Sequence, residues 1–447
     1  MTIKITNDLT QIDYPRYDSY KETSEEWIGK IPTTWDSVPL RNIFKFRNEK
    51  NDPIITDEIL SLSIAHGVTK YSDKNRGGNK RKDDITAYKI ARPNDIVLNS
   101  MNIIVGAVGL SKYFGAISPV YYALYLHSNE ANINYYEWVF HNESFQKSLL
   151  KYGKGILIKM GEGGKMNTIR MKISQHDMKY FILPCPPLSD QEKIAKFLVK
   201  KTNQIDQAIT LKQQQIAKLE EYKQIIIQNA VTKGLNPDAP MKDSGVDWIG
   251  NIPEHWEVKK LKYIVKIRKR IIGYEGVDIL SITQKGVKVK DITSGEGQLA
   301  MDYSKYQIVH IGDFAMNHMD LLTGYIDISK FEGVVSPDYR VFTNEFKGVL
   351  DSYLLSILQM GYKQKILFKY GQGVSMLGRW RLPATNFNNF LIPIPSMGEQ
   401  KQIVQFINDL SVSTNKAIDI YNQNIDRLKE YKTILINQAV TGKIKVS

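Results

Sequence analysis

The sequence predicts an α+β protein built as an internal pseudo-two-fold repeat: two mixed α/β domains joined by two long helices. Two observations predict this fold class. Motifs from the first half of the chain return in the same order in the second half. Each half also ends in a long stretch whose apolar residues recur at heptad spacing. At 447 residues the chain is long enough for two or three domains.

The internal repeat is carried by four pairs of motifs. They are Trp27–Trp35 with Trp248–Trp256, Gly115–Tyr121 with Gly333–Tyr339, Tyr152–Gly155 with Tyr370–Gly373, and Phe181–Pro186 with Phe390–Pro395. The distance between partners shrinks slowly along the chain, which indicates that the second copy has lost short loop segments. A repeat of this kind must be recognised first, because it fixes the architecture.

The first part of each copy is predicted to be a mixed α/β globule. Short β-branched and aromatic runs, such as Ile96–Leu98, Val120–Leu126 and Tyr339–Phe342, alternate with Gly, Asn and Pro and indicate strands. Amphipathic spacing predicts helices at Tyr135–Leu150 and Leu350–Leu367.

The second part of each copy is predicted to be one long helix. Ser189–Glu192 and Ser396–Glu399 have the form of a capping box, and Gly234 and Gly442 follow as stops. The predicted coiled-coil seam consists of Ile205, Ile209, Ile216, Leu219 and Ile226 in the first helix and Ile418, Ile425, Leu428 and Leu435 in the second. Packing of each stripe on its own domain is the alternative. Helices of about 40 residues would span about 60 Å, more than either globule, which favours antiparallel pairing.

These patterns divide the chain into six segments. The predicted segments are an N-terminal tail at 1–20, a first domain at 21–188, a central helix at 189–233, a linker at 234–247, a second domain at 248–397 and a C-terminal helix at 398–447. The linker is rich in Gly, Pro and Asp, so it can reverse the chain but cannot continue a helix.

The composition indicates what kind of partner the protein binds and in which compartment it works. Sixty Lys and Arg residues against 47 Asp and Glu give a formal net charge of +13, which favours a polyanion such as DNA, RNA or an anionic membrane surface. No apolar run long enough to span a membrane and no signal peptide is apparent. The single cysteine, Cys185, excludes an intramolecular disulfide and a cysteine-built zinc site, and a reducing cytoplasm is expected.

Taken together, the motifs resemble the specificity subunit of type I restriction–modification systems. The resemblance rests on the W-I-G-x-I-P-x-x-W motif in each half, on N-S-M or M-N-H-M after Asp95 and Asp313, and on S-P-x-Y at Ser118 and Ser336. It continues with the Pro-rich strand end before Asp190-Gln191 or Glu399-Gln400, and with the linker run 234–250. Each motif alone is weak, but their order and repetition are specific.

This resemblance implies a fold and a set of partners. Two target-recognition domains would each read half of an interrupted double-stranded DNA sequence. The paired helices would set the distance between half-sites and dock two methyltransferase subunits, and a restriction and translocase subunit would join the complex. S-adenosylmethionine, ATP and Mg would then be bound by the partners, and this chain would hold no cofactor or metal.

The residues give no catalytic constellation of their own. The chain contains no phosphate-binding loop, and Gly106–Gly109, the segment closest to a cofactor loop, is better explained as a tight turn. Cys185 is expected to be a packed side chain and His66 a loop-tip residue. Asp95 and Asp313 are expected to be turn residues. The residues thus predict a chain without catalytic activity of its own, and the resemblance implies that it directs adenine methylation and DNA cleavage by its partners.

Candidate DNA contacts are basic and amide side chains in loops beside Gly, Asn or Ser, since such loops can enter a groove. In the first half they are Lys74, Arg76, Asn79, Lys80, Arg81, Lys154, Lys159, Lys165 and Arg170. In the second half they are Arg268, Lys269, Arg270, Lys285, Lys288, Lys290, Gln372, Arg379 and Arg381. Arg can contact guanine and Asn or Gln adenine through paired hydrogen bonds, so Arg76, Asn79, Gln372 and Arg379 are the expected base readers.

Two other functions remain open at this stage. A solitary DNA-binding regulator would use the paired helices for homodimerisation. An RNA-binding or membrane-surface protein would use the same positive charge. Dependence of tight binding on a companion methyltransferase distinguishes a specificity subunit from the regulator, and preference for single-stranded RNA would indicate the RNA-binding class.

Overall fold

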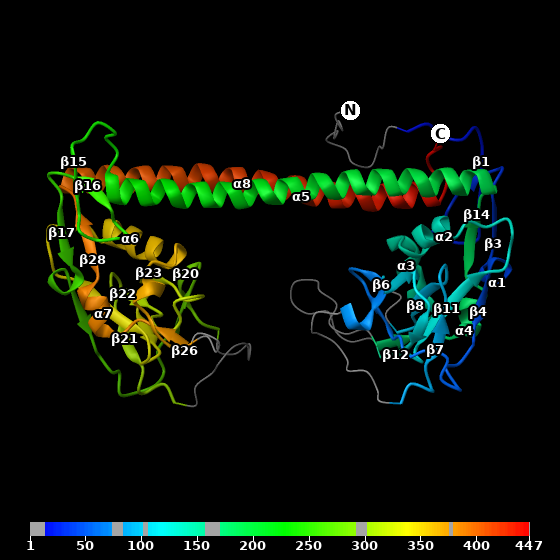
Figure 1. Cartoon of the computed structure of the whole chain (residues 1–447), viewed down its shortest axis with the longest axis horizontal. Coiled ribbons are helices and arrows are strands. Elements are labelled where there is room, and N and C mark those ends of the chain that lie inside the picture. Colours follow the sequence, from blue (N-terminus) through cyan, green and yellow to red (C-terminus); the bar gives the residue numbers. More distant parts are fainter. Residues whose placement is uncertain are drawn as a thin grey trace. The chain divides into compact units, whose positions relative to one another are not determined.

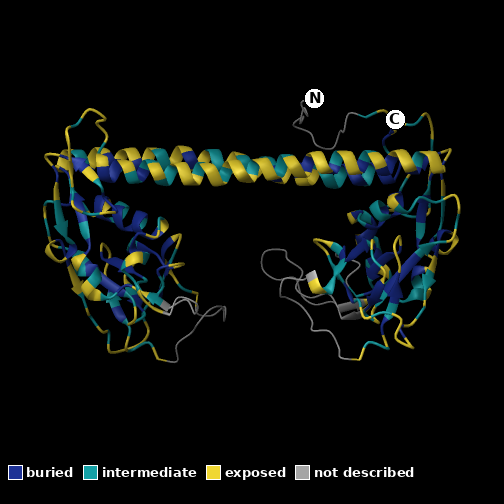
Figure 2. Ribbon diagram, viewed as in Figure 1, coloured by how far each residue is buried: buried dark blue, intermediate teal, exposed yellow. Residues whose placement is uncertain are grey.

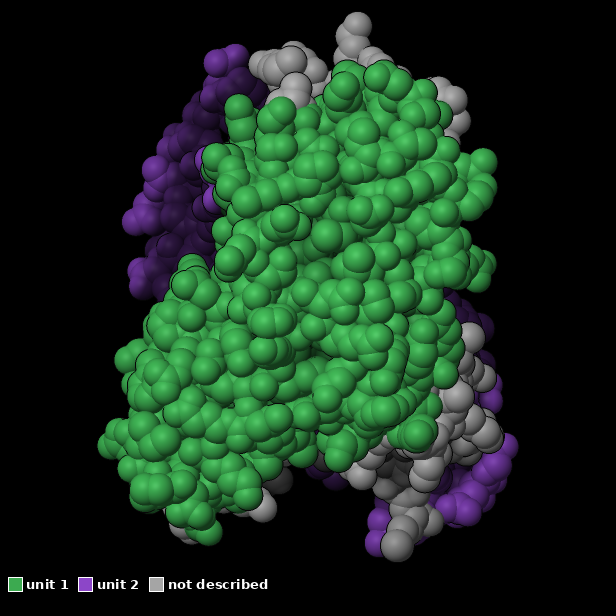
Figure 3. Space-filling model, turned by 90° about the vertical axis from the view of Figure 1, so that its right-hand side faces the viewer, with its two compact units in different colours: residues 1–212, 422–447 green, residues 213–421 purple. Residues whose placement is uncertain are grey.

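The structure is a computed structural model that describes residues 14–73, 84–101, 106–156, 170–291, 302–374 and 379–446. Contacts divide the chain into two units. Unit 1 comprises Met1–Lys212 and Asn422–Ser447, and unit 2 comprises Gln213–Tyr421. Figure 3 colours the two units and shows one face of unit 1. Each unit therefore combines one globular part with segments of both long helices.

The globular part of unit 1 is made of short strands and short helices. Its strands are β1 (Tyr20–Lys21), β2 (Ile31–Pro32), β3 (Asp36–Pro39), β4 (Phe44–Arg47), β5 (Leu60–Ser63), β6 (Gly67–Lys70), β7 (Lys89–Ala91), β8 (Ile96–Asn99), β9 (Val108–Leu110), β10 (Gly115–Ile117), β11 (Tyr121–Leu126), β12 (Lys154–Ile156), β13 (Arg170–Lys172) and β14 (Ile182–Cys185). Its helices are α1 (Leu40–Ile43), α2 (Ile133–Phe140), α3 (Glu143–Ser148) and α4 (Gln175–Met178), with 3-10 turns at Tyr71–Asp73 and Leu149–Tyr152.

The globular part of unit 2 repeats this order. Its strands are β15 (Met241–Asp243), β16 (Asn251–Pro253), β17 (Glu257–Lys260), β18 (Val265–Arg268), β19 (Leu280–Thr283), β20 (Gly286–Val289), β21 (Gln307–Val309), β22 (Phe314–Met316), β23 (Ile326–Ile328), β24 (Gly333–Val335), β25 (Arg340–Asn344), β26 (Gln372–Val374), β27 (Arg379–Arg381) and β28 (Leu391–Ile394). Its helices are α6 (Asp351–Lys363) and α7 (Ala384–Asn389), with 3-10 turns η4 (Leu261–Tyr263) and η5 (Leu367–Tyr370).

Sheet topology shows the internal repeat most directly. The four-stranded sheet β4-β11-β8-β9 of unit 1 has the same order as β18-β25-β22-β23 of unit 2. The hairpins β5–β6 and β12–β13 correspond to β19–β20 and β26–β27, and the pair β3–β14 corresponds to β17–β28. The predicted fold class and pseudo-two-fold repeat are therefore confirmed.

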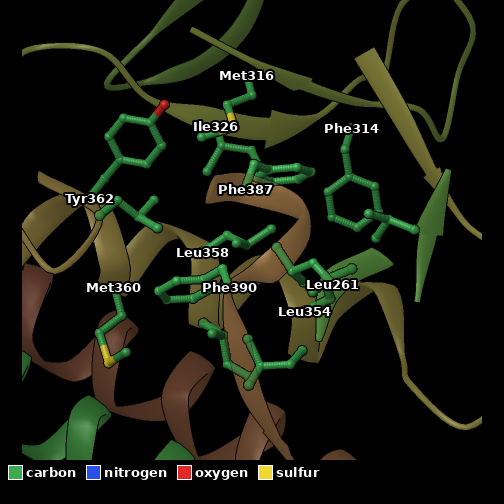
Figure 4. Packing of buried hydrophobic residues seen from close by; sticks show 14 of the residues in the cluster. Leu261, Phe314, Met316, Ile326, Leu354, Leu358, Met360, Tyr362, Phe387 and Phe390 are labelled. Atoms are coloured by element: carbon green, nitrogen blue, oxygen red, sulfur yellow. The ribbon is translucent and has the colours of Figure 1, made fainter. Parts of the chain in front are cut away.

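Each unit has its own hydrophobic core. In unit 2 the core combines Phe314 and Met316 of the sheet, Leu354 and Leu358 of α6, and Phe387 of α7 (Figure 4). The rings of Phe314 and Phe342 stack with centroids 4.9 Å apart. In unit 1 the corresponding layer is formed by β4, β8 and β11 against α2.

The two long helices are α5 (Leu188–Lys233) and α8 (Met397–Val440), labelled in Figure 1. In unit 1, Asp206 of α5 forms an ion pair of 2.7 Å with Lys432 of α8. In unit 2, Lys223 of α5 donates to Asn415 of α8 at 3.4 Å. A late residue of one helix meets an early residue of the other in both cases, so the pairing is antiparallel, as predicted.

Burial along the seam agrees with most of the heptad prediction. Ile205, Ile425, Leu428 and Leu435 are buried. Ile209, Ile216, Leu219, Ile226 and Ile418 are half-buried. Figure 2 shows exposed and half-buried residues alternating along both helices, while the fully buried residues concentrate in the globular parts. Near the end of α5, Ile227 and not Ile226 enters the core of unit 2.

Both long helices end against a tryptophan of the repeated motif. Gly442 follows α8 with φ +70°, and a Cβ there would lie 2.9 Å from Trp35. Gly234 follows α5 with φ +75°, and a Cβ there would lie 3.2 Å from Trp256. A glycine is required at both positions because the backbone is left-handed and the indole ring leaves little space.

The capping-box prediction is confirmed in the second copy and wrong in the first. The Ser396 amide donates to Glu399 Oε2 at 3.0 Å, and the Glu399 amide donates back to Ser396 Oγ at 3.3 Å. In the first copy α5 begins at Leu188, so Ser189 lies inside the helix. The position equivalent to Ser396 is Pro187, whose carbonyl accepts from the Asp190 amide at 2.9 Å.

The predicted helices inside the globules are present, but one prediction missed a break and the other runs four residues past the end of its helix. The segment predicted as one helix at Tyr135–Leu150 is split into α2 and α3, because Asn142 caps a new helix by accepting from the Phe145 amide at 2.9 Å. The segment Leu350–Leu367 contains the single helix α6. Within the described part of the chain, no helix combines the length and apolarity needed to cross a bilayer.

Glu399 makes the start of α8 sensitive to acid. Desolvation raises its pKa, but hydrogen bonds from Ser396, Trp256 and His255 outweigh it and lower the pKa to about 2. A depressed pKa stabilises the fold above the unfolded value near 4.5, and this contribution is lost as pH falls toward 2. We expect Glu399→Gln to remove that part of the pH dependence, measured as the unfolding free energy between pH 5 and 2. An unchanged pH profile in the variant would contradict this assignment.

Candidate nucleic-acid interface

Three segments of unit 2 meet to form a surface that we call the loop face of unit 2. They are the β19–β20 turn at Gln284–Lys285, the loop 317–324 and the hairpin β26–β27. Gln284 Nε2 donates to the Thr323 carbonyl at 3.5 Å. The Leu321 amide donates to the Trp380 carbonyl at 3.0 Å, and the Leu382 amide donates to the His318 carbonyl at 2.8 Å. These bonds fix the central loop against both hairpins.

The loop 317–324 is held internally by short polar side chains. Asn317 Oδ1 accepts from the Met319 amide at 3.3 Å, and Asp320 Oδ1 accepts from the Leu322 and Thr323 amides at 2.9 and 3.0 Å. A Cβ at Gly324 would lie 2.1 Å from the Asp320 carbonyl oxygen, so no side chain fits there. A compact turn of this kind presents its outer side chains in a defined arrangement.

Unit 1 repeats part of this arrangement in the described residues. The Met101 amide donates to Asn99 Oδ1 at 3.0 Å, which begins the equivalent loop. The Ile173 amide donates to the Ser100 carbonyl at 3.1 Å, as the Leu382 amide does to His318 in unit 2. We call this loop together with the hairpin β12–β13 the loop face of unit 1. His66 is exposed at the β5–β6 turn, as expected. Lys285 lies in the equivalent turn of unit 2, between β19 and β20.

Asp95 and Asp313 do more than form the turns predicted for them. Each accepts from the amide three residues earlier at 2.9 Å, which is the expected turn. Each is also almost fully buried and pairs with an arginine, Arg47 to Asp95 at 2.6 Å and Arg270 to Asp313 at 2.6 Å. Buried carboxylates need such a partner. Arg270, a candidate DNA contact, therefore has a structural role in holding this turn.

The remaining candidate contacts fall into three groups. Lys154, Lys269, Lys285, Lys288, Gln372 and Arg381 are exposed, and Lys290 is half-buried. Arg268 is bound within the fold, donating to Thr343 at 2.9 Å and pairing with Glu345. Lys74, Arg76, Asn79, Lys80, Arg81, Lys159 and Lys165 lie outside the described residues, and Arg170 and Arg379 are described by their backbone only. Lys285, Gln372 and Arg381 are thus brought to one loop face.

Several basic side chains at these faces were not anticipated from the sequence. In unit 2, the loop 317–324 contains the half-buried His318, and Arg340 of β25 is buried nearby. Burial, then Arg340 and Arg381, lower the pKa of His318 to about 3. In unit 1, Lys89 donates to the Tyr121 carbonyl at 2.9 Å, and burial followed by Lys172 lowers its pKa. The sequence signal was the S-P-x-Y motif, which immediately precedes Arg340.

The described residues contain no group of three or more His, Cys, Asp and Glu side chains placed to hold a metal ion. Cys185 is half-buried, and burial raises the pKa of its thiol. A thiol that stays protonated is a poor nucleophile, so the side chain fits a packing role.

Family comparison identifies both halves of the chain. The model of the type I restriction modification DNA specificity domain matches residues 32–221 and again residues 253–430. The two matches correspond to the two copies seen in the sheet topology, each with its own globular part and most of its long helix.

Individual relatives agree with this result. The type I restriction enzyme MjaVIII specificity subunit of Methanocaldococcus jannaschii is 27% identical over 446 residues, covering 96% of this chain and 97% of the relative. The EcoBI specificity subunit of Escherichia coli is 23% identical, covering 61% of this chain and 60% of the relative. A solved chain from work on complex assembly and conformational transition of the type I R-M system has a TM-score of 0.63 at 12% identity, covering 92% of this chain and 98% of that one. At that identity the likeness shows a shared fold.

Proposed function

Because the chain belongs to the family of type I restriction modification DNA specificity domains, we propose that each of its two units reads one half of an interrupted double-stranded DNA sequence. The observation that carries this proposal is the pair of loop faces. Both contain the loop after the equivalent sheet strand and an equivalent hairpin, but the hairpins differ in length and charge: β12–β13 joins Lys154 to Lys172, and β26–β27 joins Gln372 to Arg381. A common scaffold with divergent loops suits the reading of two different half-sites.

The exposed lysines of the β19–β20 hairpin would contact DNA phosphates. Each phosphate contact contributes about 0.9 to the slope of log affinity against log salt. We therefore expect Lys285→Gln with Lys288→Gln to lower that slope by about 2 while the preferred sequence stays the same. The exposed Lys262 lies on η4, outside the loop face, and Lys262→Gln is the matched control. An unchanged slope in the double variant would remove these lysines from the interface.

The chain is proposed to direct chemistry that its partners perform. Two methyltransferase subunits would bind S-adenosylmethionine and methylate adenine, and a restriction and translocase subunit would use ATP and Mg to cut unmodified DNA. The chain itself would bind no cofactor and would act in the cytoplasm, where its DNA target lies. Exposed apolar side chains along the helices, such as Tyr222, Ile225 and Val412, offer a surface for these subunits.

The paired helices are proposed to set the separation of the half-sites. α5 has 46 residues and α8 has 44. At about 1.5 Å per residue, each helix is about 65–70 Å long. Half-sites on one face of DNA repeat at about 34 Å, so a rod of this length is of the right order to link two of them.

Co-expression with the neighbouring methyltransferase, followed by mapping of methylated adenines in host DNA, tests the function. The proposal predicts methylation at one interrupted motif. A well-formed complex that methylates no such motif would refute it, and no comparison supports a solitary regulator as the substitute.

A further inference from the structure

Arg340 joins the strand at the centre of unit 2 to the hairpin of the loop face. Its Nη2 donates to the Leu382 carbonyl at 3.0 Å, and the Leu382 amide donates to the His318 carbonyl at 2.8 Å. Leu382, which follows β27, thereby links strand β25 to the loop 317–324. The guanidinium also lies over the ring of Phe387, 4.6 Å from its centroid.

Unit 1 builds the same link with a different side chain. Tyr122 Oη donates to the Ile173 carbonyl at 3.2 Å, and the Ile173 amide donates to the Ser100 carbonyl at 3.1 Å. Tyr122 pairs with Leu98 across the sheet as Arg340 pairs with Met316, so the two residues are equivalent. A cross-link from the central strand to the hairpin base is therefore common to both units, although the residue that makes it has changed.

The arginine is a costly way to make this link. Arg340 is 5% exposed, no carboxylate pairs with it among the described residues, and its Nη1 has no hydrogen-bond partner. Burial lowers its pKa to about 10, which still leaves it charged near neutral pH. Nδ1 of the neighbouring His318 is also buried without a partner. Burying a charge without a counter-ion is unfavourable, and a tyrosine serves the same geometry in unit 1.

We infer that Arg340 is a positioning residue for the second half-site, because it fixes the loop 317–324 relative to the hairpin β26–β27, as Tyr122 does in unit 1. This inference rests on the proposed function. It assigns Arg340 no contact with DNA, since its free nitrogen is buried. The residues it positions are the exposed ones on the loop face, among them Gln372 and Arg381.

Three substitutions of Arg340 separate its hydrogen bond from its charge. Arg340→Met removes both, Arg340→Tyr restores the unit 1 link without charge, and Arg340→Lys keeps the charge without the guanidinium geometry. Tyr122→Phe removes one hydroxyl from unit 1 and is the matched change in the other copy. Each variant is tested as the full chain in complex with the methyltransferase, by the ratio of methylation at cognate sites to sites mismatched in one half.

The expected result is specific to one half-site. Arg340→Met should lower discrimination at the second half-site about tenfold, and Tyr122→Phe should lower it about fivefold at the first half-site only. Arg340→Tyr should stay within about twofold of the wild type. Full discrimination in Arg340→Met would overturn the inference. Loss of discrimination in Arg340→Tyr together with full discrimination in Arg340→Lys would also overturn it, because that pair of results would show that the charge of Arg340 matters.

Hydrogen exchange of the chain tests the link without DNA. The amides of Leu321 and Leu382, which join the loop to the hairpin, should exchange about tenfold faster in Arg340→Met and at the wild-type rate in Arg340→Tyr. Unchanged exchange in Arg340→Met would contradict the inference even if the chain reads no DNA. Conversely, faster exchange in Arg340→Met, combined with a complex that methylates no motif, would support the inferred link and refute only the proposed function.

Discussion

Trp35→Ala is expected to lower the free energy of unfolding of unit 1 by about 3–5 kcal/mol, the range found when a buried tryptophan is truncated in a core. Trp35 is fully buried. Its Nε1 donates to Asp190 Oδ2 at 3.1 Å near the start of α5, and its ring lies against Gly442, which follows α8. One side chain thus holds the globule to both long helices. Denaturant unfolding combined with hydrogen exchange measures the loss.

Two further variants act as controls for this prediction. Trp35→Phe keeps most of the ring but loses the bond to Asp190, so a loss of about 1–2 kcal/mol is expected. Trp256→Ala should produce the equivalent defect in unit 2, because Trp256 Nε1 donates to Glu399 at 3.0 Å in the same position. If Trp35→Ala increased amide hydrogen exchange in unit 2 and left unit 1 unchanged, the assignment of Trp35 as the contact between the globule of unit 1 and the long helices would be wrong.

Lengthening both long helices by one heptad is expected to widen the spacer between half-sites by about three base pairs. Seven residues add about 10 Å of helix, and each base pair adds about 3.4 Å along DNA. The insertions belong between the two cross-helix bonds, that is between Asp206 and Lys223 in α5 and between Asn415 and Lys432 in α8. Adenine mapping of the variant complex gives the new spacer, and the bases read should stay the same.

Inserting four residues in place of seven is the control for the heptad variant. Four residues shift the apolar stripe out of phase with its partner, so the helix pair should lose stability. A folded heptad variant whose spacer is unchanged would show that the helices do not set the separation.

The repeat made the fold predictable from the sequence. The contacts of the repeated tryptophans recur in both copies: Trp35 with Asp190 matches Trp256 with Glu399, and the buried Gln191 matches Gln400. Such residues recur because the scaffold needs them in both units. The capping box predicted at Ser189 is wrong because α5 begins at Leu188, so Ser189 already lies inside the helix, and Pro187 stands at the position equivalent to Ser396.

The loop faces were harder to predict because their defining contacts are distant in sequence. Arg47 and Asp95 are almost fifty residues apart. The sequence alone therefore does not show whether a basic residue at the end of a strand pairs with a buried carboxylate or contacts DNA. The sequence for this reason predicts Arg270 as a DNA contact, although it pairs with Asp313. Arg340 was missed because the S-P-x-Y motif before it marks the position without showing that the arginine is buried, and the equivalent residue in the first copy is a tyrosine, Tyr122.

The most direct test of the central claim is a domain exchange. Residues 27–188 are replaced by the equivalent residues of a relative with a different first half-site, and methylated adenines are mapped in cells that also make the methyltransferase. The account predicts that one half-site changes to that of the relative, while the other half-site and the spacer are retained. Loss of both half-sites from a stable complex, or retention of both, would contradict the assignment of one half-site to each unit.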